Sequence, residues 1–426
     1  MSEPLYNKLN SEQRVAVEAI FGFLEDPSKL FFLLEGYAGT GKTFSLQAVL
    51  ERMKSRMIFT APTNKATKVL RETLASDDYK PECRTIYSLL GLRIEANGEV
   101  KELAIPEDPV DLSAYKCVVV DEGSMVNSSL MKAIREAAQI YKAKFLFMGD
   151  PAQLPPVGEP RSGIWSIKDK ACLTKVERHD NQILGFVTSI RQVVDNPLPK
   201  ITIKSDYDPE LGEGVLVLPG QDFESRIVDH ALRGRFSVAN TAKAISWRNV
   251  NVDKLNKLIR NHIFSNPTDP WLPDDRVIVM EPAKDHDDQI VATTDEEGRV
   301  VRAVADYHPK HGEFKIWHVS MATDEGKTIG LNVLHQDALG LYNRRVEELL
   351  SQAKSNGRYW KDFWAFKEAF HKLRHGYAIT AHRSQGSTYE EVFVDWRDIL
   401  INRNKAEAYR CLYVACSRPK KQLFLN

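Results

Sequence analysis

The clearest chemistry in the sequence lies in a glycine-rich segment, Gly36-Tyr-Ala-Gly39-Thr-Gly41-Lys42-Thr43, which matches G-x-x-x-x-G-K-[ST]. In this pattern backbone N–H groups surround phosphate oxygens, the lysine reaches the β- and γ-phosphates, and the final hydroxyl ligates Mg²⁺. The segment follows a short apolar run and precedes a helical pattern, which is the context the motif requires. We therefore predict ATP and Mg²⁺ as cofactors, with nucleotide contacts from Gly36, Ala38, Gly39, Thr40, Gly41, Lys42 and Thr43.

Two acidic residues follow the apolar run CVVV at 117–120. Asp121, at the end of that run, can ligate Mg²⁺ opposite Thr43. Glu122 beside it can orient and deprotonate an attacking water, which favours hydrolysis over phosphate transfer to another acceptor. Gln153, in GDPAQLPP, would contact the γ-phosphate as a neutral donor, although Gly-Asp-Pro by itself is an ordinary turn.

Alternating strands and helices must position these residues. The sequence predicts strands at 30–35, 56–60, 117–120 and 144–149, and helices at about 64–75 and 128–141. Apolar strands that alternate with helices are typical of a parallel sheet covered on both faces, with functional groups at the C-terminal strand ends. The alternation resumes after residue 172, with a strand at 243–247 and an amphipathic helix at 252–264. An α/β fold with two such lobes follows.

Two segments interrupt this alternation. In the first, RIEANGEVKEL turns at Asn97-Gly98 and predicts a β-hairpin over 93–103. In the second, short runs typical of antiparallel strands precede a charged, aromatic-rich helical segment at about 340–372, which indicates an inserted β-barrel with helices. The predicted boundaries are 1–83 and 113–171 for the first lobe, 84–112 for the hairpin, 172–273 and 371–426 for the second lobe, and 274–370 for the barrel with its helices.

The composition fits a protein with real cores, since 43% of the residues are hydrophobic. Lys+Arg and Asp+Glu both number 58, and this zero net charge argues mildly against a nucleic-acid binder. A local positive groove would be enough, however. The five cysteines form no C-x-x-C pair and suggest reduced thiols. Because no signal peptide or apolar run of about 20 residues is present, we expect a soluble, cytoplasmic protein without membrane contact.

Eight motifs together resemble the superfamily 1B helicases, the group that contains RecD, the Pif-type helicases and the Dda type of T-even phages. They are LNSEQRVAV (9–17), GYAGTGKT, TAPTNKAT (60–67), TIYSLLG (85–91), VVVDEGSM, GDPAQLPP, YAITAHRSQGSTYEEV (377–392) and LYVACSRPKK (412–421). Chain length and the inserted β domain are most similar to the Dda type. The resemblance implies two RecA-like P-loop lobes, an SH3-like barrel inserted in the second, and an ATP-dependent DNA helicase, in the host cytoplasm if a phage encodes it.

The resemblance also implies roles for individual residues. Gln13, supported by Asn10, would read the adenine edge, and Gln385 and Gly386 would face the nucleotide. Two arginine fingers from the second lobe would stabilise transition-state charge, and these are Arg178 and Arg418. The contacts to single-stranded DNA would come from Pro62, Thr63, Asn64, Thr85, Thr380, His382 and Ser384.

Several points stay open at the level of sequence. The family usually has Thr-Asn where this chain has Trp247-Arg248-Asn249, and the hairpin shows no large aromatic residue to act as a wedge. The aromatic group Tyr359, Trp360, Phe363 and Trp364 fits packing better than base stacking.

The expected activity is 5′-to-3′ movement on single-stranded DNA with separation of forked or tailed duplexes, a direction that the resemblance alone implies. The alternatives are a translocase that displaces bound proteins and a nucleotide-switched binding module. One chain holds both halves of the ATP cleft, so a monomer would suffice. Partners such as a single-strand DNA-binding protein or other replication proteins would fit this activity.

Overall fold

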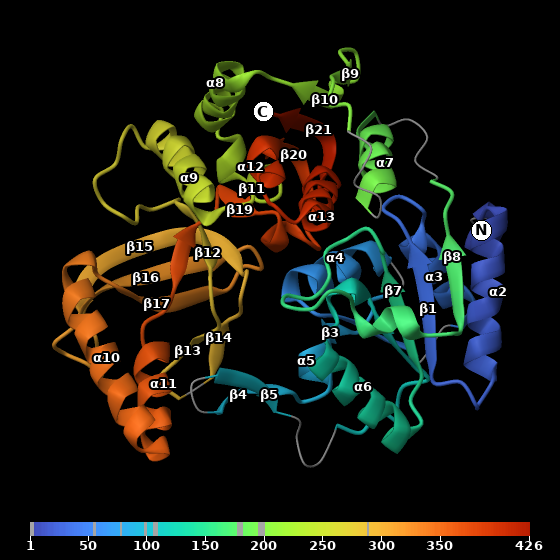
Figure 1. Ribbon diagram of the computed structural model, residues 1–426, viewed down its shortest axis with the longest axis horizontal. Coiled ribbons are helices and arrows are strands. Elements are labelled where there is room, and N and C mark those ends of the chain that lie inside the picture. The colour runs from blue at the N-terminus through green and yellow to red at the C-terminus, as the bar shows by residue number, and fades with distance from the viewer. Residues whose placement is uncertain are drawn as a thin grey trace.

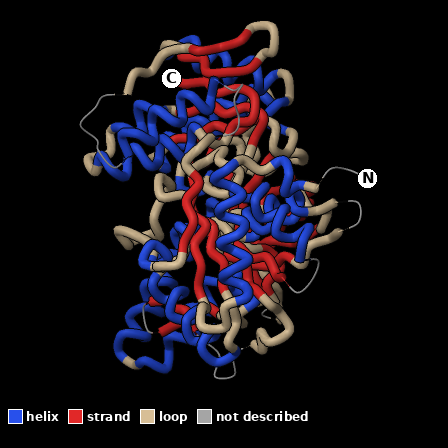
Figure 2. Tube along the Cα trace, turned by 90° about the vertical axis from the view of Figure 1, so that its right-hand side faces the viewer, coloured by secondary structure: helices blue, strands red, loops and turns tan. Residues whose placement is uncertain are grey.

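The computed structural model describes residues 4–53, 57–76, 79–97, 100–104, 110–176, 182–194, 201–287 and 289–426. Three sheets organise these residues, two of them largely parallel and one antiparallel (Figure 1). The two ends of the chain lie on different lobes, as the perpendicular view also shows (Figure 2). Within the described ranges no helix combines the length and apolarity needed to cross a bilayer.

The first lobe is built on a six-stranded sheet with the order β3-β2-β6-β7-β1-β8, in which every pair is parallel. Apolar clusters cover both of its faces, which explains why the strands carry few polar residues. The strands are β1 (Phe31–Gly36), β2 (Met57–Ala61), β3 (Cys83–Thr85), β6 (Cys117–Val120), β7 (Phe145–Gly149) and β8 (Lys170–Leu173). The helices are α1 (Leu5–Lys8), α2 (Ser11–Glu25), α3 (Lys42–Met53), α4 (Asn64–Leu74), α5 (Ile86–Leu89) and α6 (Ser128–Tyr141).

The second lobe repeats this plan with the strand order β19-β11-β20-β21-β10-β9, where only the edge strand β9 is antiparallel. Its strands are β9 (Asp206–Asp208), β10 (Glu213–Val217), β11 (Ala242–Ser246), β19 (Ala378–Thr380), β20 (Tyr389–Val394) and β21 (Pro419–Leu425). Its helices are α7 (Gln182–Val194), α8 (Gly220–Leu232), α9 (Asn249–Ile263), α12 (Trp396–Leu400) and α13 (Lys405–Cys416). The predicted α/β fold with two parallel-sheet lobes is therefore confirmed.

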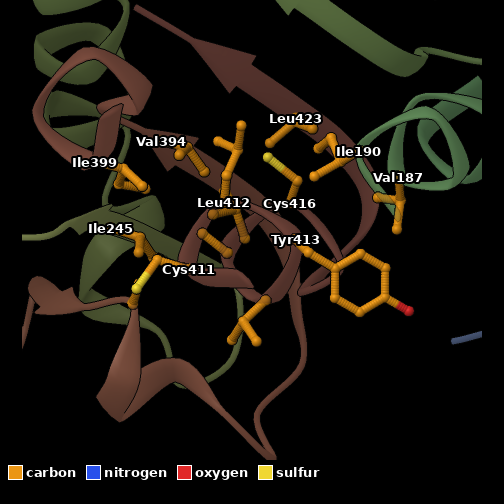
Figure 3. Close-up of a cluster of buried hydrophobic side chains, with 14 of the residues drawn as sticks. Val187, Ile190, Ile245, Val394, Ile399, Cys411, Leu412, Tyr413, Cys416 and Leu423 are labelled. Atoms are coloured by element: carbon orange, nitrogen blue, oxygen red, sulfur yellow. The ribbon is translucent and has the colours of Figure 1, made fainter. Parts of the chain in front are cut away.

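One face of the second sheet is covered by α13, which is buried along most of its length (Figure 3). Leu412, Cys416 and the ring of Tyr413 pack there against Val187 and Ile190 of α7. The hydroxyl of Tyr413 points away from this cluster. The helix thus anchors one polar group at the border of an otherwise apolar core.

The third sheet is antiparallel, with the order β17-β16-β15-β12-β18. It is followed by two helices whose aromatic residues form their own cluster, including Phe363, which pairs with Trp360 and Trp364 at 5.5 and 5.0 Å between ring centroids. This supports packing for the aromatic group. The elements are β12 (Arg276–Val279), β13 (Ala283–Lys284), β14 (Ile290–Ala292), β15 (Glu297–Tyr307), β16 (Lys315–Thr323), β17 (Thr328–Leu334), α10 (Leu339–Ser355), α11 (Trp360–Glu368) and β18 (Leu373–His375). The SH3-like character of this unit and the domain boundaries stay predictions.

The predicted hairpin consists of β4 (Arg93–Asn97) and β5 (Val100–Ala104), which pair antiparallel. Its turn at 98–99 lies outside the described residues. The strand β4 approaches α11 of the third unit, so the hairpin of the first lobe reaches the insertion of the second (Figure 1).

Candidate nucleotide site and lobe interface

The phosphate loop connects β1 to α3, and its shape depends on glycine. Gly39 and Gly41 have φ angles of +80° and +83°. A Cβ on Gly41 would lie 2.3 Å from Nε2 of Gln13. Lys42 Nζ donates to the carbonyl oxygens of Gly36 at 2.6 Å and Tyr37 at 3.1 Å, so the ammonium group lies inside the loop. The contact of Lys42 with the β- and γ-phosphates stays a prediction of the motif.

Gln13 ties the first long helix to this loop. Asn10 Oδ1 accepts from Gln13 N at 2.8 Å, and Gln13 Oε1 accepts from Asn10 N at 3.0 Å, so the two residues form a capping box at the start of α2. Gln13 Nε2 also donates to the Thr40 carbonyl at 3.1 Å. Both residues lie beside the loop, as the resemblance implied, and the reading of adenine stays a prediction.

Asp121 and Glu122 follow β6 and lie close to Lys42. Asp121 Oδ1 accepts from Glu122 N at 2.8 Å, and Glu122 has a left-handed backbone with φ 50°. Burial and the neighbouring Asp121 raise the pKa of Glu122 to about 7, although Arg418 and Lys42 oppose this shift. Burial likewise raises the pKa of Asp121. A carboxyl group with a pKa near neutrality is well matched to accepting a proton from water.

The donor set fits Mg²⁺. Thr43 is the second residue of α3 and lines the same cleft as Lys42. The positive charge of Lys42 opposes the rise in the pKa of Asp121 that burial causes. A hydroxyl and a carboxylate are oxygen ligands of the kind that Mg²⁺ prefers, together with phosphate oxygens. These two residues would hold the ion in the proposed site.

Residues of both lobes line one large cleft of about 1470 Å³. From the first lobe it includes the end of the phosphate loop and the exposed side of α4. From the second it includes Thr388, Ser417 and Lys420. The phosphate loop therefore lies at the border between the lobes.

Gln153 meets Gln385 across this border. Gln385 Nε2 donates to Gln153 Oε1 at 3.0 Å and to Ser124 Oγ at 3.2 Å. The next residue, Gly386, has φ 73°, and a Cβ there would lie 3.1 Å from Ala66 Cβ. Sequence reasoning assigned Gln385 to the nucleotide, and the structure adds a direct contact with Gln153.

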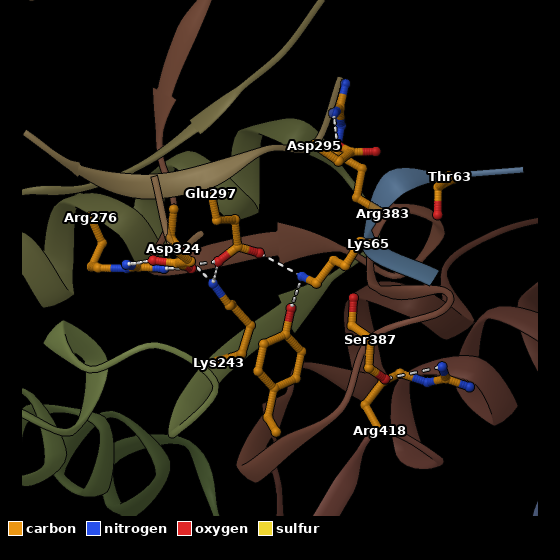
Figure 4. Close-up of polar contacts among 12 residues, drawn as sticks. Thr63, Lys65, Lys243, Arg276, Asp295, Glu297, Asp324, Arg383, Ser387 and Arg418 are labelled. Atoms are coloured by element: carbon orange, nitrogen blue, oxygen red, sulfur yellow. Dashed lines mark hydrogen bonds and ion pairs between the residues drawn. The ribbon is translucent and has the colours of Figure 1, made fainter. Parts of the chain in front are cut away.

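Arg418 is buried in the second lobe. Its Nε donates to Val414 O at 2.8 Å and its Nη1 to Ser387 O at 3.2 Å (Figure 4). Its positive charge nevertheless lowers the pKa of Glu122. A cation from each lobe, Lys42 and Arg418, thus acts on one carboxyl group. Arg178 lies outside the described residues.

Four of the predicted DNA contacts, Pro62, Thr63, Asn64 and Thr85, lie near the start of helices in the first lobe. Thr63 Oγ1 accepts from Ala66 N at 3.1 Å and caps α4, and Thr85 Oγ1 accepts from Ser88 N at 3.1 Å and caps α5. Asn64 is exposed beside Thr63, and Pro62 is half-buried. Their contact with a DNA strand stays a prediction.

The other three lie at the end of β19, as Thr380 does, or just after it, as His382 and Ser384 do. Thr380 Oγ1 accepts from Arg383 N at 3.3 Å, and His382 Nε2 lies 3.6 Å from Glu407 Oε1. Ser384 is fully buried and donates to Ala381 O at 2.7 Å. Ser384 supports its own turn in this structure, so a contact between its hydroxyl and DNA stays a prediction.

Sequence reasoning missed two residues of α13 that reach the first lobe. Tyr413 donates to Asp150 Oδ2 at 2.7 Å and accepts from Ala38 N at 3.0 Å. Arg410 donates to the carbonyl oxygens of Pro151 and Gln153. Both lie in or next to the motif that contains Arg418, and this proximity was the available signal.

A second contact between the lobes is ionic and was not expected from the sequence. Lys65 of α4 donates to Glu297 Oε1 of β15 at 2.6 Å and to the hydroxyl of Tyr389 at 2.7 Å. Lys243 of β11 donates to Glu297 Oε2 at 2.8 Å. Arg276 approaches the same oxygen at 3.4 Å (Figure 4). We call this group the Glu297 cluster.

The Glu297 cluster keeps its charges despite burial. Burial alone would raise the pKa of Glu297, but Lys243, Lys65 and Arg276 outweigh it and hold that pKa well below its usual range. Burial would likewise lower the pKa of Lys65, yet Glu297 and Tyr389 raise it. The carboxylate and its cations therefore stabilise one another's charged forms.

A phosphate loop, an acidic strand end and a cleft between two parallel-sheet lobes define a P-loop nucleoside triphosphatase with two lobes. Two family models match this chain. One is an AAA domain at residues 8–192, and the other is a UvrD-like helicase C-terminal domain at residues 375–426. The first spans most of the first lobe, and the second spans the C-terminal strands and α13.

Similar proteins narrow this class. The chain is 25% identical to the ATP-dependent DNA helicase dda of Enterobacteria phage T4, over 98% of this chain and 99% of that protein. It is 22% identical to an uncharacterized protein of Acanthamoeba polyphaga mimivirus, over 97% and 99%. Among solved structures, Pif1 helicase from Bacteroides in complex with ADP-AlF3 and single-stranded DNA covers 98% of this chain and 92% of its own, with 17% identity and a TM-score of 0.50. Together the family models, the phage T4 relative and the shared fold support a superfamily 1B helicase of the Pif1/Dda type, an ATP-dependent enzyme.

Proposed function

We propose that the protein is an ATP-dependent DNA helicase that moves 5′-to-3′ along single-stranded DNA and separates duplex strands. The relative from phage T4 is a DNA helicase, and one structural neighbour was described unwinding forked double-stranded DNA, with a TM-score of 0.52 and 16% identity. The direction rests on family resemblance alone. The single observation that carries the proposal is that the phosphate loop of the first lobe and residues of the second line one cleft, across whose border Gln385 contacts Gln153.

Hydrolysis would proceed in the cleft between the lobes. Lys42 and the loop amides would hold the β- and γ-phosphates, and Thr43 and Asp121 would hold Mg²⁺, which supplies charge neutralisation at the phosphates. Glu122 would accept a proton from the attacking water. Arg418 would approach the γ-phosphate as the lobes close, so that turnover depends on their relative position.

Movement would follow because each lobe carries its own candidate contacts to the DNA backbone. The segment around Thr63 belongs to the first lobe and the segment around Thr380 to the second. Closing and opening of the cleft would change the distance between these segments. If the two lobes alternate in holding the strand, each ATP cycle produces one step.

The active-site assignment is tested with two variants and one control. Lys42→Ala should abolish turnover, and Glu122→Gln should bind ATP while its kcat falls by roughly 10²–10⁴-fold, because the general base is lost. Glu25→Gln, an exposed glutamate at the end of α2, should match the wild type. Near-normal DNA-stimulated turnover in either site variant would show that the catalytic residues lie elsewhere.

The pH dependence offers a second test of Glu122. A general base must be ionised, so with its pKa raised to about 7 in the free protein the wild-type kcat/KM for ATP should increase as the pH rises through 7 and level off above it. The residual turnover of Glu122→Gln should lack this limb. A limb that persists unchanged in the variant would assign it to another group.

Strand separation is assigned to the hairpin of β4 and β5, which reaches α11. Deletion of 94–102 should spare ATP-driven movement on single strands and abolish unwinding of tailed duplexes. Unwinding by the deletion variant would favour a different wedge. Duplexes with a 5′ or a 3′ tail establish the direction in the same assay, and displacement of bound protein without unwinding would identify a translocase.

A further inference from the structure

A hydroxyl group from the second lobe lies at the base of the phosphate loop. Tyr413 OH accepts from Ala38 N, inside the loop, and donates to Asp150 Oδ2 at the end of β7. A tyrosine hydroxyl has one donor and can accept as well, so both contacts can form together. This single atom therefore joins two segments of the first lobe that are more than 100 residues apart in the chain.

Asp150 transmits this contact to Gln153. Asp150 Oδ1 accepts from Ala152 N at 2.9 Å, and Asp150 O accepts from Gln153 N at 3.1 Å. The carboxylate therefore shapes the turn that presents Gln153. The charge of Asp150 also reaches the Glu122 carboxyl.

The ring of Tyr413 is held rigidly. It is 1% exposed and packs with Ile190 and Val187 of α7 (Figure 3), and Arg418 follows two residues after the end of α13. The hydroxyl, in contrast, contacts only groups of the first lobe among the hydrogen bonds of the described residues. The position of the Tyr413 hydroxyl relative to the phosphate loop therefore depends on how the two lobes are placed.

We propose that Tyr413 is a positioning residue, which sets the phosphate loop and the Gln153 turn for hydrolysis only when the second lobe is in place. This inference rests on the proposed ATPase function. When the lobes separate, Ala38 N and Asp150 lose their shared partner, and the loop and the turn are no longer held in register. Tyr413 acts through these groups and does not itself contact the nucleotide.

The test compares two buried tyrosines. Tyr413→Phe removes the hydroxyl and keeps the ring. Tyr377 is a matched control, because its hydroxyl also accepts from a backbone N–H, that of Arg276 at 3.1 Å, and donates to a carboxylate, Asp275 Oδ1 at 2.9 Å. Both partners of Tyr377 lie far along the chain from the phosphate loop, so Tyr377→Phe removes equivalent bonds without touching the loop or the Gln153 turn.

ATP hydrolysis is measured for both variants with and without a single-stranded oligonucleotide. Loss of one hydrogen bond to a carboxylate and one to a backbone N–H should lower kcat of Tyr413→Phe by about tenfold, while KM for ATP changes by less than about threefold, because the rest of the loop still binds phosphate. Tyr377→Phe should keep the wild-type kcat. Equal kcat values for the two variants, or a change in KM alone, would overturn the inference.

Asp150→Asn provides an independent route to the same contact. If Tyr413 acts through Asp150, the kcat of the double variant should be no lower than that of the slower single variant. A double variant whose loss of kcat equals the product of the two single losses would contradict action through Asp150. If Tyr413→Phe does not fold, Asp150→Asn alone should show the kcat loss, and a normal kcat there would refute the inference. An ATPase of the wild type that ignores DNA would count instead against the proposed function.

Discussion

Two of the interfaces between the first lobe and the rest of the molecule differ in chemistry. Near the phosphate loop Tyr413, Gln385 and Arg410 make hydrogen bonds in which at most one partner is charged. At the Glu297 cluster, Lys65 inserts its charge beside a buried carboxylate that also binds Lys243.

The two interfaces differ in the free energy that is needed to separate them. A neutral hydrogen bond contributes about 0.5–1.5 kcal/mol net and one with a single charged partner about 1.5–3 kcal/mol, because water can replace the lost partner. Breaking a buried ion pair by removing one partner costs about 3–5 kcal/mol, because the remaining charge stays without compensation. We therefore expect the interface near the phosphate loop to open and close during the cycle, and the Glu297 cluster to hold the arrangement together.

The strongest way to break this comparison is Glu297→Gln. The substitution leaves three cations around a neutral amide, so the free energy of unfolding should fall by about 3–5 kcal/mol. Tyr413→Phe should cost clearly less in the same urea titration. A loss below about 1 kcal/mol for Glu297→Gln would show that the cluster does not stabilise the fold.

The pH dependence of this loss in the free energy of unfolding tests whether the Glu297 carboxylate is its source. Because the folded-state pKa of Glu297 lies below its ordinary value of 4.5, the carboxylate contributes stability that is present above pH 4.5 and is lost as the pH falls through the lowered pKa. The difference between wild type and Glu297→Gln should thus be full at pH 7 and shrink well below pH 4.5. Unfolding measured over a pH series checks this, and a difference that grows in acid would contradict it.

Lys65→Met removes one cation and keeps an apolar chain of similar length. Glu297 retains Lys243 and Arg276, so the expected loss is about 1.5–3 kcal/mol, the range for a hydrogen bond to a charged group. Thermal unfolding of this variant beside Glu297→Gln should rank the two in that order. The reverse order would place the main stabilisation outside the carboxylate.

An exposed ion pair serves as the comparison for which the smallest change in the free energy of unfolding is expected. Arg233 Nε lies 2.9 Å from Asp229 Oδ1 on α8, and both side chains are well exposed. Arg233→Ala should change the free energy of unfolding by at most about 0.5 kcal/mol. An effect comparable to that of Lys65→Met would mean that burial does not distinguish the Glu297 cluster.

Much of the fold was predictable because it depends on local patterns. Apolar runs and turn residues placed β1, β6 and β7 and the helices α4 and α6 within a residue or two of their bounds, and the glycines of the phosphate loop have the positive φ angles that their motif needs. The short strands β8 and β9 and the strand β17 were not predicted, since their pairing depends on neighbours distant in sequence.

The candidate site was predictable to the extent that motifs carry it. Lys42, Asp121 and Glu122 come together as expected. The contacts of Tyr413 with Ala38 and of Lys65 with Glu297 join residues more than 200 positions apart, and no local pattern encodes them. Burial of Ser384 was equally invisible, because a serine in a turn has the same sequence signature whether it is exposed or covered.

The pairing of β12 with β18 has a consequence for how the chain is connected. Val277 lies opposite His375 and Val279 opposite Leu373, so the chain leaves the second lobe and returns to it through neighbouring strands of one ribbon. Neighbouring strands lie about 4.8 Å apart. Because the two connections lie side by side, a short turn joining 277 to 375 would remove the inserted unit that carries α10 and α11 without rerouting the chain of the lobe.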